Sequence, residues 1–386
     1  MNQAVRQCRD FLVSLKLTVV LLALGMVLIF AATLSQVDLG VWGVQQRFFH
    51  SFFAVWHVGF LYVPLPGGYL VGGLLLFNLV AAHLYRFRFT WRKSGILFTH
   101  LGVILLLVGE LLSGLWQETY LMKIDQGQTV GYTEHERRYE LAISDTTNPQ
   151  FDEVVAIPAD FLTRGDPIQH PKLPFRVVPK IYYPNAALAN RTDATAAPSP
   201  ATQGLGTQIV ASPLPLTYKD DERNLPALFV ELVGAEGSLG TWLVSPDLGA
   251  PQTFTLGDRT WKLALRAERS YKPFALTLLE LRHDVYPGTD IPKNFSSRVR
   301  LVTLDGRENR EVLIYMNNPL RYAGLTFYQY QMNAAGNYTV LQVVRNPSWE
   351  LPYISCTLVG LGLLVHFGIH LLGFFGKRRV PQPAAA

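Results

Sequence analysis

Cysteine is scarce in this sequence, which has two among 386 residues, Cys8 and Cys356. They occur in neither a C-x-x-C nor a C-x-x-C-H motif, so the chain carries no thiol–disulfide redox motif and is not itself a c-type cytochrome. Cys8 precedes the first apolar run and Cys356 lies inside the last one, so we do not expect the two to pair. The sequence also shows no internal repeat.

Charged residues are scarce too, at 16%, whereas soluble proteins have about 25%. The hydrophobic residues, 49% of the chain, concentrate in four runs at about 17–34, 67–85, 95–115 and 353–375. Each run has the roughly 17–25 residues that a helix needs to cross a bilayer, so we predict four transmembrane α-helices. The first run is longer than the apolar core of a signal peptide, so we expect it to be retained.

Lysine and arginine indicate the orientation in the membrane. They cluster before the first run, in an elbow between the second and third runs, and after the fourth: Arg6, Arg9, Lys16, Arg86, Arg88, Arg92, Lys93, Lys377, Arg378 and Arg379. The loop 37–66 holds a single basic residue, Arg47. The positive-inside rule therefore predicts a multi-pass protein of the inner (cytoplasmic) membrane with both termini cytoplasmic. The net charge of +5 needs no nucleic-acid partner to explain it.

The polar stretch 117–352 is long enough for a domain with its own core. Seven segments combine β-branched and aromatic residues with partial alternation, which predicts strands: 138–144, 175–183, 227–233, 260–268, 275–281, 298–316 and 338–344. Asp305-Gly306 predicts a hairpin turn inside the sixth segment. The segment 186–215 is rich in Ala, Thr and Pro and has no periodicity, so we expect a flexible loop that divides the domain into two lobes.

The predicted fold class is therefore a membrane protein with three parts. Residues 1–116 form the N-terminal membrane region, 117–352 form a large β-rich extracytoplasmic domain inserted between helices 3 and 4, and 353–386 form the fourth helix and a cytoplasmic tail. Aromatic residues recur at roughly helical spacing after the first helix, so we also expect an amphipathic interfacial helix at about 41–60. His50 and His57 would lie on it as interfacial polar residues.

Four histidines fall inside the predicted spans, at His83, His100, His366 and His370. His83 and His100 are equidistant from the midpoint of the elbow, so a regular helical hairpin puts them at similar depth in the cytoplasmic half of the bilayer. Neutral imidazole is a good ligand for iron, copper, zinc or nickel, but a membrane histidine often only forms a hydrogen bond between helices. His366 and His370 share one helix face, so they could chelate a small ion but not clamp a flat macrocycle.

Other classes of function remain open at this point. No acidic cluster accompanies these histidines, which argues against a proton relay or a divalent-cation pathway. A small-molecule transporter would be expected to show inverted repeats and broken helices, and the chain has neither pattern. A membrane tether for the outer domain needs no chemistry from the histidines.

Several parts of the sequence, spread over nearly the whole chain, resemble the ResB (CcsB) family of System II cytochrome c biogenesis. They are the first apolar run "FLVSLKLTVVLLALGMVLIFAATLSQ", the elbow followed by "FTHLGVILLLVGELLSG", and the segment "IPKNFSSRVRLV". The strongest markers are the block "NNPLRYAGLTFYQ" at 317–329 and Asn346-Pro347 before the last helix. The long middle of the domain matches weakly. The resemblance implies a partner of the ResC (CcsA) type, which carries a tryptophan-rich haem motif that this sequence lacks.

The resemblance also implies a role in haem handling. The chain would hold haem b as transient cargo and present apocytochrome c together with the partner, as a non-catalytic subunit of a cytochrome c synthetase complex. The family's membrane histidine best matches His100 as an axial ligand of the haem iron, with His83 as the alternative. The "NNPLRYAGLTFYQ" block is expected to serve a structural or docking role. The competing hypothesis is a membrane-tethered binding or assembly module without haem.

Overall fold

The computed structural model describes residues 3–191, 198–219, 222–289, 292–333 and 337–378. The chain forms two compact units. Unit 1 comprises Met1–Glu118, Tyr218–Asp220 and Arg345–Ala386, and unit 2 comprises Thr119–Thr217 and Asp221–Val344. Residues 192–197 of the expected loop and 379–386 of the expected tail lie outside the described residues.

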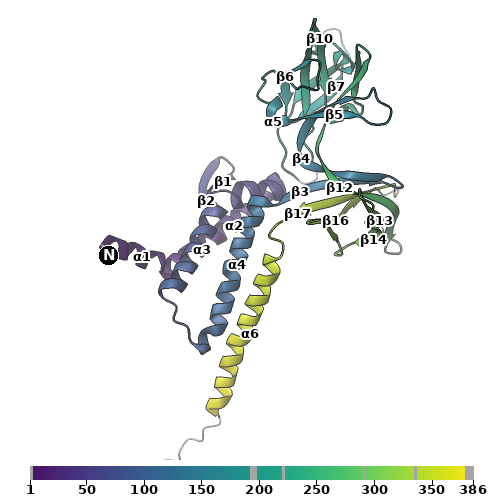
Figure 1. Cartoon of the computed structure of the whole chain (residues 1–386). Helices are drawn as coiled ribbons and strands as arrows, with labels where there is room; N and C mark the ends of the chain where they lie inside the picture. The colour runs from purple at the N-terminus through teal and green to yellow at the C-terminus, as the bar shows by residue number, and fades with distance from the viewer. Residues whose placement is uncertain (1–2, 192–197, 220–221, 290–291, 334–336, 379–386) are drawn as a thin grey trace, which may run out of the picture. The chain divides into compact units, whose positions relative to one another are not determined.

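Unit 1 is helical, and four of its helices are long and apolar enough to cross a membrane. The four predicted helices are confirmed, and the strands β3 to β17 follow α4 and precede α6 in the chain (Figure 1). The helices are α1 (Gln3–Leu12), α2 (Leu15–Val44), α3 (Gly68–Tyr85), α4 (Ser94–Trp116) and α6 (Leu351–Arg378).

One buried polar side chain joins the first three helices. Asn78 on α3 donates to the carbonyls of Leu12, at 2.6 Å, and Ser14, at 3.3 Å, and accepts from the Thr18 hydroxyl at 2.7 Å. Arg86 extends this contact by donating to the Val13 carbonyl. An amide in a membrane span is costly unless it is satisfied, so these bonds explain why Asn78 is tolerated and fix α3 against the α1–α2 junction.

The prediction of an interfacial helix at 41–60 is wrong for most of that segment. After a break at Gly40 (φ 67°), α2 ends at Val44 and a π-helical turn, η1 (Gln45–Phe49), follows. The chain then forms an antiparallel hairpin of β1 (Phe53–Val58) and β2 (Leu61–Pro66). Its turn puts Gly59 at φ 61° in the first central position, the pattern of a type II′ turn, and β2 contains two prolines that a helix interior would not tolerate.

Unit 2 is built from strands, and all seven predicted segments lie in strands, although 260–268 and 275–281 are parts of one long strand, β12. The largest sheet has the order β14-β13-β12-β4-β3-β17-β16-β15, with β5 and β11 paired to β4 and β12. The other sheets are β10-β9-β6 and β7-β8. The strands are β3 (Glu118–Asp125), β4 (Thr129–Asp145), β5 (Glu153–Pro158), β6 (Arg176–Tyr183), β7 (Ala186–Asn190), β8 (Ile209–Pro213), β9 (Ala227–Gly234), β10 (Gly237–Val244), β11 (Gln252–Leu256), β12 (Arg259–Val285), β13 (Pro292–Thr303), β14 (Asn309–Tyr315), β15 (Leu320–Tyr322), β16 (Leu325–Met332) and β17 (Tyr338–Arg345).

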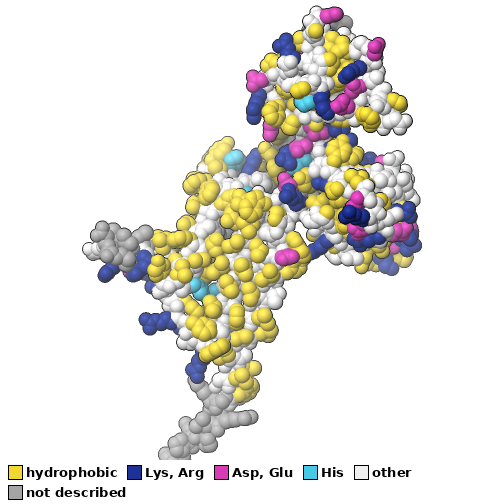
Figure 2. Space-filling model, in the orientation of Figure 1, with side chains coloured by type: hydrophobic (Ala, Val, Ile, Leu, Met, Phe, Trp, Pro, Cys, Tyr) yellow, Lys and Arg dark blue, Asp and Glu magenta, His cyan; other side chains and the backbone are white. Residues whose placement is uncertain are grey.

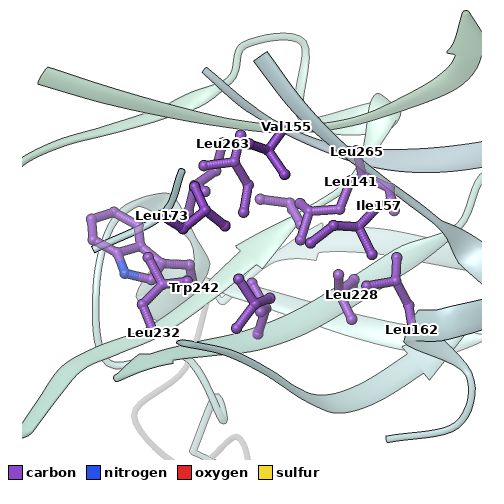
Figure 3. Close-up of a cluster of buried hydrophobic side chains, with 14 of the residues drawn as sticks. Leu141, Val155, Ile157, Leu162, Leu173, Leu228, Leu232, Trp242, Leu263 and Leu265 are labelled. Carbon is purple, nitrogen blue, oxygen red and sulfur yellow. The ribbon is translucent and has the colours of Figure 1, made fainter. Parts of the chain in front are cut away.

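Two hydrophobic clusters form the main cores of unit 2, and the long strands β4 and β12 contribute to both. One cluster joins Leu141 of β4 and Leu263 of β12 to β5, β9 and Trp242 (Figure 3). The other contains Leu276 of β12 with β3, β13, β16 and β17, and Val130 of β4 packs against it. The two lobes are therefore joined by β4 and β12, whose pairing has register shifts between Ala267 and Arg269 and between Tyr271 and Leu276.

The prediction of a flexible loop at 186–215 is wrong at both ends of the segment. Strands β7 and β8 pair in register from Ala186 with Pro213 to Asn190 with Ile209. Ala186 and Ala201 are buried in a small core with Phe229 and Leu243. Alanine is common in loops of low complexity, but here its small side chain allows close packing against β9 and β10, a long-range contact that composition does not reveal.

Candidate functional site

The two histidines beside the elbow contact one another. Nδ1 of His100 on α4 lies 3.1 Å from Nε2 of His83 on α3, and the two rings meet edge to face with centroids 4.8 Å apart. Nδ1 of His83 lies 2.9 Å from the Leu79 carbonyl, and the His83 ring stacks on Phe87. Both rings are half-buried, and Figure 2 shows a histidine patch within the hydrophobic surface of the helices.

The carbonyl of Leu79 determines the direction of this hydrogen-bond chain. A carbonyl only accepts, so Nδ1–H of His83 donates to it, and Nε2 of a neutral His83 is then an acceptor. His100 consequently donates its Nδ1–H to His83, and Nε2 of His100 keeps its lone pair. This is the arrangement of a typical metal-ligating histidine, whose second nitrogen donates to an orienting group. The geometry thus distinguishes His100, with an available nitrogen, from His83, with both nitrogens engaged.

A seam of glycines orients α4 between its two neighbours. Gly95, Gly102 and Gly109 are buried at seven-residue spacing, and each lies against α6. His100 is two residues before Gly102, about 200° around an ideal helix, so it projects from the opposite face of α4. The glycines therefore allow α6 to pack closely on one side while His100 meets α3 on the other (Figure 1).

The second membrane histidine pair lies on α6. The rings of His366 and His370 are 4.6 Å apart, and Nδ1 of His366 is buried with no hydrogen-bond partner among the described residues. Across the described part of the chain, no group of three or more His, Cys, Asp or Glu side chains could hold a metal ion. The four membrane histidines thus form two pairs and no single four-histidine centre.

The remaining histidines have structural contacts. His50 stacks on Tyr69, and His57 contacts Tyr62 edge to face in the hairpin. His57 also lines a groove of about 550 Å³ between the end of α2, η1 and β1, together with Asp38 and Arg47.

The histidines of unit 2 make hydrogen bonds and ring contacts within that unit. Nδ1 of His135 accepts from the backbone N–H groups of residues 137 and 138, and Nδ1 of His170 accepts from that of residue 172. His283 stacks on Phe295. These contacts support turns and strands, and the three residues show no ligand geometry.

The block "NNPLRYAGLTFYQ" is a hairpin in the second core. Phe327 is fully buried, whereas Tyr328 and Tyr330 are 39% and 38% exposed. The turn between β15 and β16 is Ala323-Gly324, and both residues have positive φ, of 49° and 74°. A second turn, Met316-Asn317, precedes Pro319, with Asn317 at φ 62°. The block therefore combines a structural core with one exposed tyrosine, Tyr328, and a second exposed tyrosine, Tyr330, follows directly after it.

An ion-pair ladder that the sequence did not predict lies where β4 and β12 pass between the two cores. Arg266 donates to Glu140, which is 4% exposed, at 2.9 Å, and Arg269 donates to Glu134 at 3.0 Å. The Arg269 guanidinium also lies 4.1 Å from the centre of the Tyr132 ring, and burial raises the pKa of Tyr132. A cavity of about 350 Å³ lies beside the ladder. The available signal was the presence of charged residues, Glu140 and Arg266, inside two segments that were predicted to be strands.

Comparison with known proteins gives a family match over residues 80–337, to the ResB-like family. Protein NrfI of Wolinella succinogenes is 35% identical over 115 residues, which is 29% of this chain and 12% of that protein. Cytochrome c biogenesis protein CcsB of Crocosphaera subtropica is 41% identical over 68 residues, 18% of this chain and 15% of that protein. The aligned segments thus cover a small part of each relative, whereas the family match covers most of this chain, from within α3 to the residue before β17. The chain belongs to the ResB-like family.

Proposed function

We propose that this chain works in cytochrome c biogenesis as the subunit that holds haem in the membrane and presents apocytochrome c, together with a ResC/CcsA-type partner. The family match and the name of the CcsB relative support the general role. The contact between His83 and His100 is the observation that carries the haem-binding part of the proposal.

In this proposal His100 is the axial ligand and His83 is a positioning residue. Nε2 of His100 is available to iron, while His83 fixes its ring orientation and tautomer. Nδ1 of His100 and Nε2 of His83 are 3.1 Å apart and engaged in one hydrogen bond, so these two atoms would not hold an iron between them. A further ligand would come from the partner.

The proposed site lies near the cytoplasmic surface of the inner membrane. His83 is three residues before Arg86, and the elbow adds Arg88, Arg92 and Lys93. Basic residues at this density favour the cytoplasmic side. Haem held here would have entered from the cytoplasm, and unit 2 would face the opposite compartment, where cytochromes c are assembled.

The test is to replace each histidine in the full chain, co-expressed and co-purified with a ResC/CcsA-type partner. We expect His100→Ala to remove most of the co-purifying Soret absorbance and to lower cytochrome c maturation, with partial rescue by imidazole. His83→Ala should weaken haem binding by about 10–100-fold, the usual effect of losing an orienting partner. His370→Ala is the matched control, a membrane histidine outside this pair.

Two results would contradict the assignment. Unchanged haem content in His100→Ala would remove His100 as the ligand. A larger loss in His83→Ala than in His100→Ala would reverse the two roles.

The second candidate is a membrane-tethered binding or assembly module without haem. The same hydrogen bond favours it, because two membrane imidazoles that satisfy each other need no ligand, and such a bond contributes about 1 kcal/mol. This function predicts no Soret band in the purified complex and normal maturation in all three histidine variants.

A further inference from the structure

The hairpin β1–β2 exposes an unusually apolar surface. Six side chains are more than half exposed: Phe52, Phe53, Val55, Phe60, Leu61 and Tyr62. Phe60 at the tip is 88% exposed, and no charged residue occurs from Phe48 to Tyr85. A two-stranded ribbon is marginal in water by itself, and a contiguous apolar patch on a protein surface usually marks an interaction site.

One side of the hairpin packs against α2 and η1, which belong to the same unit. Ala54 is buried with Phe48 of η1, and Trp56 packs edge to face on Phe30 of α2 with ring centroids 6.2 Å apart. Leu65 on β2 packs against the same cluster. The base of the hairpin is thus fixed to α2, while the tip and the outward face have no cover among the described residues.

The prolines of β2 affect its free edge. The Gly67 N–H donates to the Phe52 carbonyl at 2.8 Å, and in the register Pro66 pairs with Phe53 and Pro64 with Val55. Antiparallel pairs alternate between hydrogen-bonded and open positions, so both prolines occupy open pairs, where the backbone nitrogen points to the outer edge. Proline has no N–H, so Tyr62 retains the one outward N–H along this edge.

This edge fits a lipid environment better than a docked strand. An added strand would need the outward N–H groups that two prolines remove. Fewer unsatisfied donors also lower the cost of placing the edge at low dielectric. An open edge is not tolerated in the hydrocarbon core, so the boundary between headgroups and acyl chains is the compatible depth.

We propose that the β1–β2 hairpin is a lipid-binding element that inserts its tip and outward face into the bilayer interface opposite the basic elbow. The hairpin connects α2 directly to α3, so both of its ends start from membrane-spanning helices. Phe, Trp and Tyr are the residues that favour this interface. This proposal does not depend on haem binding.

The test measures the environment of two exposed positions in the full chain with Cys8→Ser and Cys356→Ser. A nitroxide spin label is attached to Phe60→Cys, and in a second protein to Leu304→Cys, a matched control that is 79% exposed in unit 2. Each protein is placed alone in phosphatidylcholine–phosphatidylglycerol nanodiscs. Collision rates with oxygen, which concentrates in lipid, and with a water-soluble nickel chelate are then measured.

We expect the label at residue 60 to collide with nickel severalfold less often than the label at 304, and with oxygen more often. Equal nickel accessibility at both positions would overturn the proposal. So would protection of residue 60 that arises only when a partner protein is added, because the surface would then be a protein interface.

Discussion

The glycine seam between α4 and α6 predicts a specific sensitivity at Gly102. A Cβ atom there would lie 2.7 Å from Cγ2 of Val359 and 2.8 Å from the Ser355 carbonyl oxygen. Ordinary contacts begin at 3.4 Å, so Gly102→Ala forces the two helices apart by about 0.7 Å. Overpacking of this kind costs about 1–3 kcal/mol. Gly360→Ala on α6 is the matched control, because its Cβ would meet nothing within 4 Å.

The assay is unfolding of both variants in mixed detergent with increasing dodecyl sulfate, followed by circular dichroism. Gly102→Ala should unfold at a lower dodecyl sulfate fraction than Gly360→Ala, by a difference equivalent to about 1–3 kcal/mol. Because Gly102 is two residues from His100, the displaced helix should also reduce co-purifying haem if His100 is its ligand. Equal unfolding midpoints for the two variants would refute the close packing that orients α4.

Two further predictions concern unit 2. Ala323→Asn should raise local stability by about 1 kcal/mol, because asparagine tolerates the left-handed conformation that Ala323 adopts at φ 49°. Hydrogen exchange in β15 and β16 should then be slower, and unchanged exchange would contradict this prediction. Burial raises the pKa of Tyr182 to about 12, so the neutral phenol is favoured in the folded state and unit 2 should lose stability as pH rises from about 10 to about 12. Urea unfolding followed by tryptophan fluorescence should show a shallower loss over this range in Tyr182→Phe, and an identical pH profile would exclude this contribution.

Much of the architecture follows from local sequence patterns. Four apolar runs predicted the long helices because length and hydropathy are properties of the segment alone. The strands were recognisable for the same reason, and Asp305-Gly306 marked the hairpin between β13 and β14. At 41–60, aromatic spacing indicated a helix, but Gly59 and the two prolines of β2 were the stronger local signal. The β7–β8 pair was missed because its stability comes from contacts with distant strands.

The site could be predicted in part. Equal spacing from the elbow placed His83 and His100 at one depth, and their rings do meet. The rotation of α4 about its axis and the direction of the hydrogen bond could not be predicted. The rotation is set by packing against α6, more than 240 positions along the chain from Gly102. The direction is set by the Leu79 carbonyl, which accepts from His83.

The strands β4 and β12, paired from Trp261 with Asp145 to Thr277 with Thr129, have a consequence for how unit 2 folds and fails. Residues of β4 and β12 pack in or against both cores, so we expect neither half to fold as an excised fragment. Damage in one half should therefore be transmitted to the other through these two shared strands.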